Sequence, residues 1–391
     1  MVRLFEHPRT SEHKGIKCLG ITRDALGPLV RKKLEDGRLT KQAGRQRSHR
    51  FAIALVCVLT IAWNLDGKVL ASGSNDQTVK PHDGAAGKPL ASLQGYAGDV
   101  YSVAWNPDGK TFATGSDDQT VKLWEASTGK LLANLPGHTD SICSVAWSPD
   151  GRTLASSSGD TTMKLWEAAT GKLLTSLQGH TGDVRGIAWS PDGKTLVSGC
   201  TDHTVKLWEV AMGKLLASLL GHTDGVLSVA WNPDGKTVAS GSRDRTIKLW
   251  EAATDKLLAT LQGHTGDVYS IAWSPDGKTL ASASGDQGVK LWDAVTGKLL
   301  ANLQGHTGAV YSIAWSPTGE ALGSGSGDRT VKLWEAATGK LLATLQGHTG
   351  AVYSVAWSPD GKTLASASDD RTVKLWDVAA GKERSPEAPE H

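Results

Sequence analysis

The stretch Gly347 to Trp376 reads GHTGAVYSVAWSPDGKTLASASDDRTVKLW, and its pattern recurs upstream every 42 residues, as from Asp370 to Asp328 (370 − 328). The turn aspartate recurs at Asp370, Asp328, Asp286, Asp244, Asp202, Asp160, Asp118 and Asp76. The last tryptophan recurs at Trp376, Trp334, Trp292, Trp250, Trp208, Trp166 and Trp124. A fixed period of this length indicates one supersecondary unit that is stacked many times into a single array.

Each period divides into four short apolar segments that are separated by turn-forming residues. The last complete period predicts strands over 340–346, 351–357, 362–368 and 372–377. Ser-Pro-Asp-Gly follows the strand at 351–357, and its Pro and Gly supply the backbone angles that a tight hairpin requires. Four antiparallel strands per period correspond to one blade of a propeller.

A Gly-His near the start of each period and a Trp-Asp or Trp-Glu near its end are typical of WD40 repeats. On these motifs the chain resembles the WD40-repeat family, in the style of bacterial tandem arrays, over residues 57–382. The resemblance implies an all-β fold, a single WD40 β-propeller of four-stranded antiparallel blades. A shared fold does not by itself identify a function.

The number of blades depends on how the first unit is interpreted. Seven periods from Gly95 to Trp376 are well formed, whereas an eighth unit at 57–83 has Pro81-His82 where the others have Leu-Trp. Eight blades are favoured, because apolar strand sequence left in water would be costly; the alternative is seven blades with 57–83 outside the ring. The last unit is expected to lack its own outer strand. Residues around 46–53 would supply it in an eight-blade ring, and residues 88–94 in a seven-blade ring.

The charge distribution divides the chain into a basic arm and an acidic propeller. Residues 1–50 contain 13 Lys and Arg and 5 Asp and Glu, so their net charge is +8, while the rest carries 29 − 35 = −6. We expect residues 1–45 to be an unassigned, disordered basic arm, 46–382 the propeller, and 383–391 a disordered tail. The arm has no basic motif interleaved with aromatic residues, so nucleic acid is not the expected partner.

The four cysteines (Cys18, Cys57, Cys143 and Cys200) show no CxxC spacing and no pairing pattern. This argues against a zinc site or a disulfide framework and is typical of a reducing compartment. The apolar run 51–62 is too short to span a bilayer. We therefore expect a cytoplasmic protein with no metal, no cofactor and no membrane partner.

Six units carry a complete set of His, Ser, Asp and Trp at matching positions. The WD40 resemblance implies that each set is a buried hydrogen-bond network. A catalytic triad is rejected, because a catalytic site is normally unique whereas this set is repeated. The predicted network comprises His138, Ser156, Asp160, Trp166, His180, Ser198, Asp202, Trp208, His222, Ser240, Asp244, Trp250, His264, Ser282, Asp286, Trp292, His306, Ser324, Asp328, Trp334, His348, Ser366, Asp370 and Trp376.

Function is expected where the near-identical units differ. The most variable positions lie four residues before each Ala-Trp tryptophan and on either side of the turn aspartate, and the resemblance places them on the narrower face. Tyr and Arg often anchor interfaces, and Arg binds carboxylate or phosphate in bidentate fashion. The candidate partner-binding residues are therefore Arg185, Arg243, Arg245, Tyr269, Tyr311, Arg329, Tyr353 and Arg371.

These residues predict a non-enzymatic scaffold that binds a protein or peptide, preferably an acidic one, on the narrow face of the propeller. The alternative is the sensor propeller of a larger bacterial signalling protein whose catalytic part lies upstream. An enzyme that uses the central channel would need a unique cluster of titratable groups there, and the inner strands show none.

Overall fold

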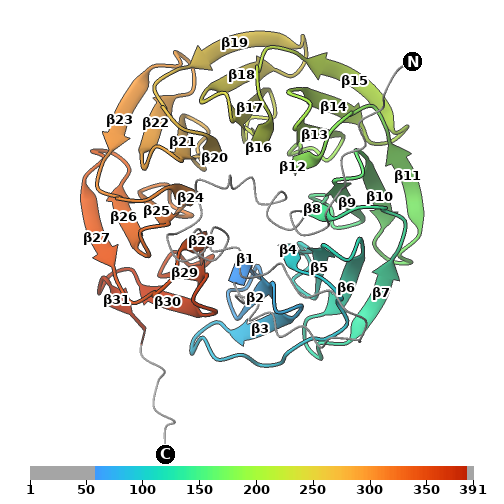
Figure 1. Ribbon diagram of the computed structural model, residues 1–391, viewed down its shortest axis with the longest axis horizontal. Helices are drawn as coiled ribbons and strands as arrows, with labels where there is room; N and C mark the ends of the chain where they lie inside the picture. Colours follow the sequence, from blue (N-terminus) through green and yellow to red (C-terminus); the bar gives the residue numbers. More distant parts are fainter. Residues whose placement is uncertain (1–57, 385–391) are drawn as a thin grey trace, which may run out of the picture.

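The computed structural model describes residues 58–384, which form eight antiparallel sheets around a central axis (Figure 1). Seven sheets have four strands and the first has three. The eight-blade prediction is confirmed, and residues 58–83 lie inside the ring as part of blade 1.

Within each blade the chain runs from the inner strand to the outer strand. The inner strands are β1 (Val58–Trp63), β4 (Val100–Trp105), β8 (Ile142–Trp147), β12 (Val184–Trp189), β16 (Val226–Trp231), β20 (Val268–Trp273), β24 (Val310–Trp315) and β28 (Val352–Trp357). The second strands are β2 (Val69–Ser74), β5 (Thr111–Ser116), β9 (Thr153–Ser158), β13 (Thr195–Cys200), β17 (Thr237–Ser242), β21 (Thr279–Ser284), β25 (Ala321–Ser326) and β29 (Thr363–Ser368). The third strands are β3 (Val79–Asp83), β6 (Val121–Glu125), β10 (Met163–Glu167), β14 (Val205–Glu209), β18 (Ile247–Glu251), β22 (Val289–Asp293), β26 (Val331–Glu335) and β30 (Val373–Asp377). The outer strands are β7 (Leu131–Leu135), β11 (Leu173–Leu177), β15 (Lys214–Leu219), β19 (Lys256–Leu261), β23 (Leu299–Leu303), β27 (Leu341–Leu345) and β31 (Lys382–Glu383).

The hydrophobic core lies between blades rather than within them. Between blades 2 and 3, for example, Leu123 and Leu135 pack against Ile142, Leu154 and Trp166. The same arrangement returns at the following junctions. Both faces of a blade are therefore covered by its neighbours, which removes its apolar side chains from water.

The ring closes where blade 1 meets blade 8. Ile61 and Leu70 pack there against Ala365, Ala367 and Leu375. The indole of Trp63 donates a 3.0 Å hydrogen bond to the carbonyl oxygen of Ala356. Trp147 donates the same bond to Ala104 of the preceding blade, so the closing junction repeats the geometry of an internal one.

The expectation that the last blade lacks an outer strand of its own is wrong. Glu383 pairs with Trp376, and Lys382 pairs with Asp377, so β31 is a two-residue outer strand. The Lys374 ammonium lies 2.8 Å from both carboxylate oxygens of Glu383, and this ion pair holds the short strand in place. Residues 46–53, which were expected to take this position, lie outside the described residues.

Blade 1 replaces the lost outer strand and the lost tryptophan by other means. Two isolated bridges, Val79 to Leu93 and His82 to Pro89, join the segment after β3 to that strand, and the Leu90 N–H donates a 2.8 Å hydrogen bond to the Pro81 carbonyl oxygen. The His82 ring takes the place of the indole, because its Nε2 lies 2.8 Å from the Ser72 hydroxyl. Burial lowers the pKa of His82 to about 4, so the ring is neutral at pH 7.

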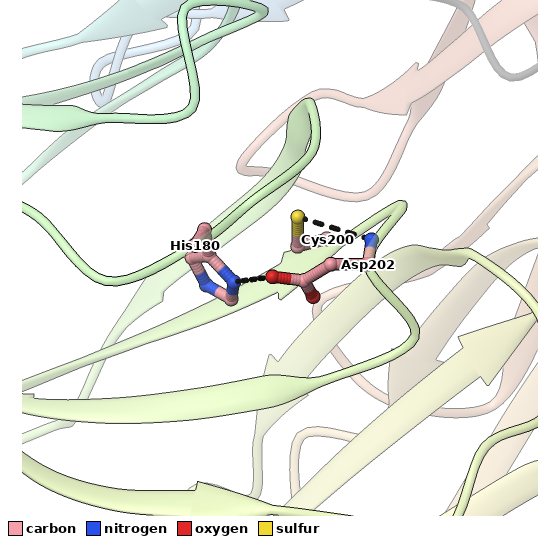
Figure 2. Close-up of side chains that lie close together, drawn as sticks. All are labelled: His180, Cys200 and Asp202. Carbon is pink, nitrogen blue, oxygen red and sulfur yellow. Dashed lines mark hydrogen bonds and ion pairs between the residues drawn. The ribbon is translucent and has the colours of Figure 1, made fainter.

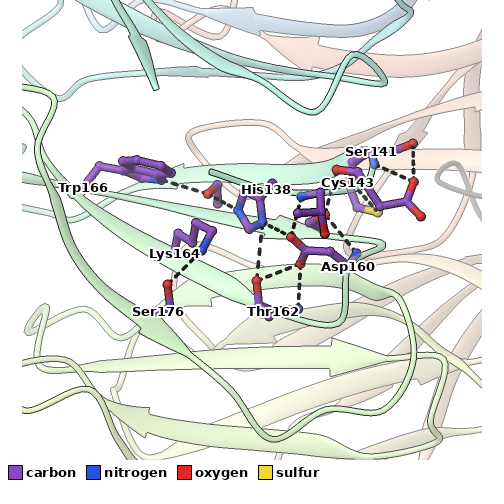
Figure 3. A network of polar contacts seen from close by, with 12 residues as sticks. His138, Ser141, Cys143, Asp160, Thr162, Lys164, Trp166 and Ser176 are labelled. Atoms are coloured by element: carbon purple, nitrogen blue, oxygen red, sulfur yellow. Dashed lines mark hydrogen bonds and ion pairs between the residues drawn. The ribbon is translucent and has the colours of Figure 1, made fainter. Parts of the chain in front are cut away.

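In blades 3 to 8 the predicted four-residue networks are assembled with nearly constant geometry. Figure 3 shows the set in blade 3, where His138 Nδ1 lies 2.8 Å from Asp160 and its Nε2 lies 2.8 Å from Ser156. The Trp166 indole donates to the same Ser156 oxygen at 2.9 Å. Because an ionised carboxylate only accepts, we assign the proton to Nδ1 and let the serine hydroxyl donate to Nε2.

The aspartate of each network binds two loops at once. In blade 6, Asp286 Oδ2 accepts hydrogen bonds from His264 Nδ1 and from the Thr265 backbone N–H, and Asp286 Oδ1 accepts one from the Gly288 backbone N–H. Burial raises the pKa of Asp286, but the hydrogen bonds from His264 and from the Thr265 and Gly288 N–H groups outweigh burial and lower it to about 2. The carboxylate therefore fastens the loop before the inner strand to the turn after the second strand.

Blade 2 lacks the histidine, and a lysine compensates for it. Tyr96 occupies the histidine position and hydrogen-bonds to Thr114, while the Trp124 indole donates to both hydroxyl groups. The Lys122 ammonium then lies 3.3 Å from Asp118, whereas the equivalent Lys164 in blade 3 reaches across to Ser176 of the outer strand (Figure 3). The aspartate thus keeps a cationic or ring N–H partner even where the histidine is absent.

One junction is open on the side of the ring that carries the Pro-Asp-Gly turns. A methyl group at Gly193 would lie 3.4 Å from Pro149 of the preceding blade, but one at Gly109 would meet nothing within 4 Å, because blade 1 has Leu65 instead of proline. A cleft of about 490 Å³ results, lined by Asn64, Asp66, Lys68, Asp108, Lys110 and Glu125, among others.

We expect Leu65→Pro to raise the free energy of unfolding by about 0.4–1 kcal/mol, because it fixes φ in the unfolded chain. Urea denaturation would measure the change. The reverse substitution Pro149→Leu is the matched control and should lower stability. A loss of stability in Leu65→Pro would show that the turn of blade 1 is incompatible with proline.

We expect His264→Ala to lower the free energy of unfolding by about 1–3 kcal/mol, because it leaves the buried Ser282 hydroxyl and the Asp286 carboxylate short of partners. His203→Asn, at an exposed turn position, is the control and should be nearly neutral, since asparagine tolerates the left-handed backbone there. Equal melting curves for His264→Ala and wild type would contradict the stabilising contribution that we assign to the network.

Candidate functional site

One face of the ring carries the loops that precede the inner strands and the turns that join second to third strands. The pairing of Val352 with Ser368 shows this, because it sets the start of β28 beside the end of β29. We call this the His-Asp face, since the network histidines and aspartates lie in these loops and turns. The resemblance predicts that it is the narrower face.

Every inner strand has a break in register near its start on the His-Asp face. In blade 4, Val184 pairs with Cys200 and Gly186 with Gly199, which leaves Arg185 between them unpaired. A β-bulge of this kind re-aims a side chain without disturbing the rest of the ladder. The eight bulged residues, which we call the bulge ring, are Leu59, Tyr101, Cys143, Arg185, Leu227, Tyr269, Tyr311 and Tyr353.

The bulge ring brings together three of the candidate residues. The ring centroids of Tyr269 and Tyr311 are 5.5 Å apart, and those of Tyr311 and Tyr353 are 5.2 Å apart. Tyr353 also packs against Leu59 and Tyr101, so five neighbouring positions form one continuous aromatic and aliphatic arc. Burial is the main cause that raises the pKa of Tyr311 above its usual value.

The other candidate arginines occupy the turns outside this arc. Arg245, Arg329 and Arg371 are exposed and have φ values of 70°, 72° and 74°. The same left-handed conformation occurs at this turn position in all eight blades, so it belongs to the scaffold.

Arg243 and Arg185 differ from these exposed arginines, because both are withdrawn from solvent. Arg243 is half-buried, and its charge acts on Asp267 of the next blade, where burial raises the carboxyl pKa. Arg185 is buried, and its Nη2 lies 2.9 Å from Asp183. The sequence pattern located these positions but did not show which of them are exposed.

One group of potential metal ligands occurs within residues 58–384. His180, Cys200 and Asp202 present ligand atoms that all lie within 4.8 Å of one another (Figure 2). Both nitrogens of His180 are engaged, at 2.8 Å from Asp202 and Ser198, and Cys200 Sγ accepts from the Asp202 N–H at 3.3 Å. Ser158 accepts the same bond in blade 3, so the cysteine substitutes for a structural serine.

Burial raises the pKa of the Cys200 thiol to about 12, which keeps it protonated at pH 7. A metal ion would therefore have to remove this proton and displace His180 from its network. Cys spacing in the sequence gave no sign of this cluster, because its three members meet only through strand pairing.

The network serines do not offer nucleophilic chemistry. Ser156 is fully buried, and its oxygen is shared by the His138 ring and the Trp166 indole. A nucleophile must reach a substrate, so this constellation serves to satisfy buried polar groups.

In the part of the chain that the structure describes, no helix is long and apolar enough to cross a membrane.

Comparisons with known proteins agree with this architecture. The family model described as WD domain, G-beta repeat matches residues 47–80, 87–125, 129–167, 171–209, 213–251, 255–293, 297–335 and 339–377. Among solved structures, the chain is similar to the crystal structure of the computationally designed Ika8 protein, with 31% identity and a TM-score of 0.75. That similarity covers 83% of this chain and 97% of the designed one. No curated protein matches.

The family model covers one segment for each of the eight blades that the structure describes. The chain therefore belongs to the WD40 repeat family.

Proposed function

We propose that this WD40 propeller is a non-enzymatic scaffold that binds a protein or peptide on its His-Asp face, the narrow face of the family. Family membership supports the general role, since WD40 propellers generally serve as protein-interaction scaffolds. The observation that carries the choice of face is the bulge ring. Its members are free to vary because a bulged residue takes no part in the strand pairing that keeps the blades alike.

The composition of the face supports an acidic partner. Tyrosine and arginine are the residue types that most often dominate binding energy at interfaces. The tyrosine arc supplies rigid apolar surface, and the exposed guanidinium groups of Arg245, Arg329 and Arg371 supply charge-assisted hydrogen bonds to carboxylate or phosphate groups. No cofactor or metal enters this proposal.

On the same face, the loops of blade 2 carry two acidic residues besides the turn aspartate and no arginine, which gives an acidic partner a preferred orientation. Asp99 and Asp117 lie in blade 2, and Asp117 accepts a hydrogen bond from Ser141 of blade 3. Burial is the main cause that raises the pKa of Asp99 to about 6, and the negative charge of Asp117 adds to it. An acidic partner would be repelled here and attracted toward the arginines.

Cys143 and Cys200 are both buried and form no disulfide bond in the part of the chain that the structure describes. Thiols outside disulfide bonds are compatible with a reducing compartment, and a cytoplasmic location is part of the proposal on this ground.

The proposed face is tested by an affinity pull-down from the native host with the full chain. The variant carries Arg243→Ala, Arg245→Ala, Arg329→Ala and Arg371→Ala. The matched control carries Lys194→Ala, Lys236→Ala, Lys278→Ala and Lys362→Ala, four exposed residues in the Pro-Asp-Gly turns on the other face, and removes the same charge. We expect some partners to be retained by the control and lost by the arginine variant. Only the arginine variant removes the guanidinium N–H donors that would bind carboxylate or phosphate groups.

Both variants must show the circular dichroism spectrum and melting curve of the wild type. Equal capture by both would place partner binding away from the turn arginines. Equal loss by both would show that net charge, rather than the His-Asp face, decides capture.

The pKa of Asp99 is predicted to fall toward the usual aspartate range of about 3.9 in Asp117→Asn, because the like charge is removed. Titration of the carboxyl carbon by NMR would measure it. In the wild type the folded pKa lies above the unfolded one, so stability should decrease between about pH 4 and pH 6 as Asp99 ionises. Asp99→Asn should remove that decrease, and an unchanged pH profile in this variant would contradict the assignment.

A further inference from the structure

Blade 4 departs from the other blades at its bulge. The other described bulge residues are tyrosine, leucine or cysteine, whereas blade 4 reads Val184-Arg185-Gly186 and places an arginine in the bulge ring. Arg185 is therefore the charged member of a ring that is otherwise aromatic, aliphatic or thiol-bearing. Its closest equivalents along the ring, Cys143 and Leu227, carry no charge.

The guanidinium group of Arg185 is buried without enough partners. Its side chain is 3% exposed, and its Nη2 donates to Asp183 Oδ2 at 2.9 Å. Its Nε and Nη1 are also buried, and neither has a hydrogen-bond partner among the described residues. Buried donors of a charged group are normally satisfied, so a group left in this state in a native fold requires an explanation.

The scaffold does not need an arginine at this position. Leu59 and Leu227 occupy the same bulge in blades 1 and 5, and both blades keep the same strand pairing. Gly186 is not imposed by the packing of blade 5, since a methyl group there would lie at an ordinary contact distance, 3.4 Å, from the Leu227 carbonyl oxygen. The strand pairing thus does not require the arginine, and its Nε and Nη1 donors are unmet among the described residues.

We propose that Arg185 is an oxyanion receptor that binds one carboxylate group of the partner, such as an acidic side chain, with Asp183 as its positioning residue. The proposal rests on the proposed function and names the group that enters the bulge ring. Asp183 holds Nη2 and leaves Nη1 to donate to the ligand. A monoanionic carboxylate fits better than a phosphate dianion, because Asp183 already places a negative charge beside the guanidinium group.

The test uses the full chain and [¹³C]acetate as the probe, in buffer without other oxyanions. Line broadening of the acetate signal in NMR reports binding. We expect saturable broadening with the wild type and an apparent affinity at least tenfold lower with Arg185→Leu, the residue that blades 1 and 5 carry. Arg152→Leu, which removes an exposed arginine from a Pro-Asp-Gly turn on the other face, is the matched control and should behave as the wild type.

Thermal melting separates a receptor from a structural ion pair. If Arg185 is a receptor, Arg185→Leu should melt at the same temperature as the wild type or higher, because a poorly satisfied buried charge is removed. A lower melting temperature together with unchanged acetate binding would overturn the proposal. Tighter binding of inorganic phosphate than of acetate would overturn the assignment to carboxylate.

The pull-down also distinguishes this inference from the proposed function. Arg185→Leu should lose the partners that the turn-arginine variant loses. If Arg185→Leu retains every partner while the turn-arginine variant loses them, the His-Asp face remains the binding face and the carboxylate receptor at Arg185 is refuted.

Discussion

The His-Asp face depends on a single carboxylate in each blade. In blade 8, Asp370 accepts hydrogen bonds from the His348 ring, from the Thr349 N–H, and from the backbone and hydroxyl of Thr372. These bonds join two loops that come from different parts of the period, and the backbone bond from the first loop to the aspartate recurs in blades 2 to 8. The aspartate persists in all eight blades, and in blades 1 and 2 a lysine ammonium lies beside it.

A β-bulge separates the scaffold from the surface that varies. Strand pairing, the inter-blade core and the polar network all depend on residues that scarcely change between periods. The bulged residue takes no part in the strand pairing or the polar network, so tyrosine, leucine, cysteine and arginine are all compatible with the same blade. Evolution of a binding surface on a repeat protein is easiest at such positions, because a substitution there costs the fold little.

Blades 1 and 8 show how much a propeller tolerates at the point where the ring closes. His82 replaces an indole, Pro81 lies in a strand that has only isolated bridges to its outer neighbour, and β31 has two residues. Proline is acceptable where a strand's N–H is not needed for pairing. The closing junction still keeps its buried apolar contact and the hydrogen bond from Trp63, features that the other junctions share except that the Trp231 indole of blade 5 makes no such bond.

The sequence by itself determined the all-β class, the strand positions, the membership of the networks and the preference for eight blades, because these features repeat at a fixed period and depend on local pairing. It also located the variable positions. Only the tertiary structure decided that Tyr269, Tyr311 and Tyr353 are in contact, that Arg185 is buried, and that Lys382–Glu383 completes the last blade. These features depend on how neighbouring blades meet around the axis, and side chains 42 residues apart in the sequence carry no local signal of that contact.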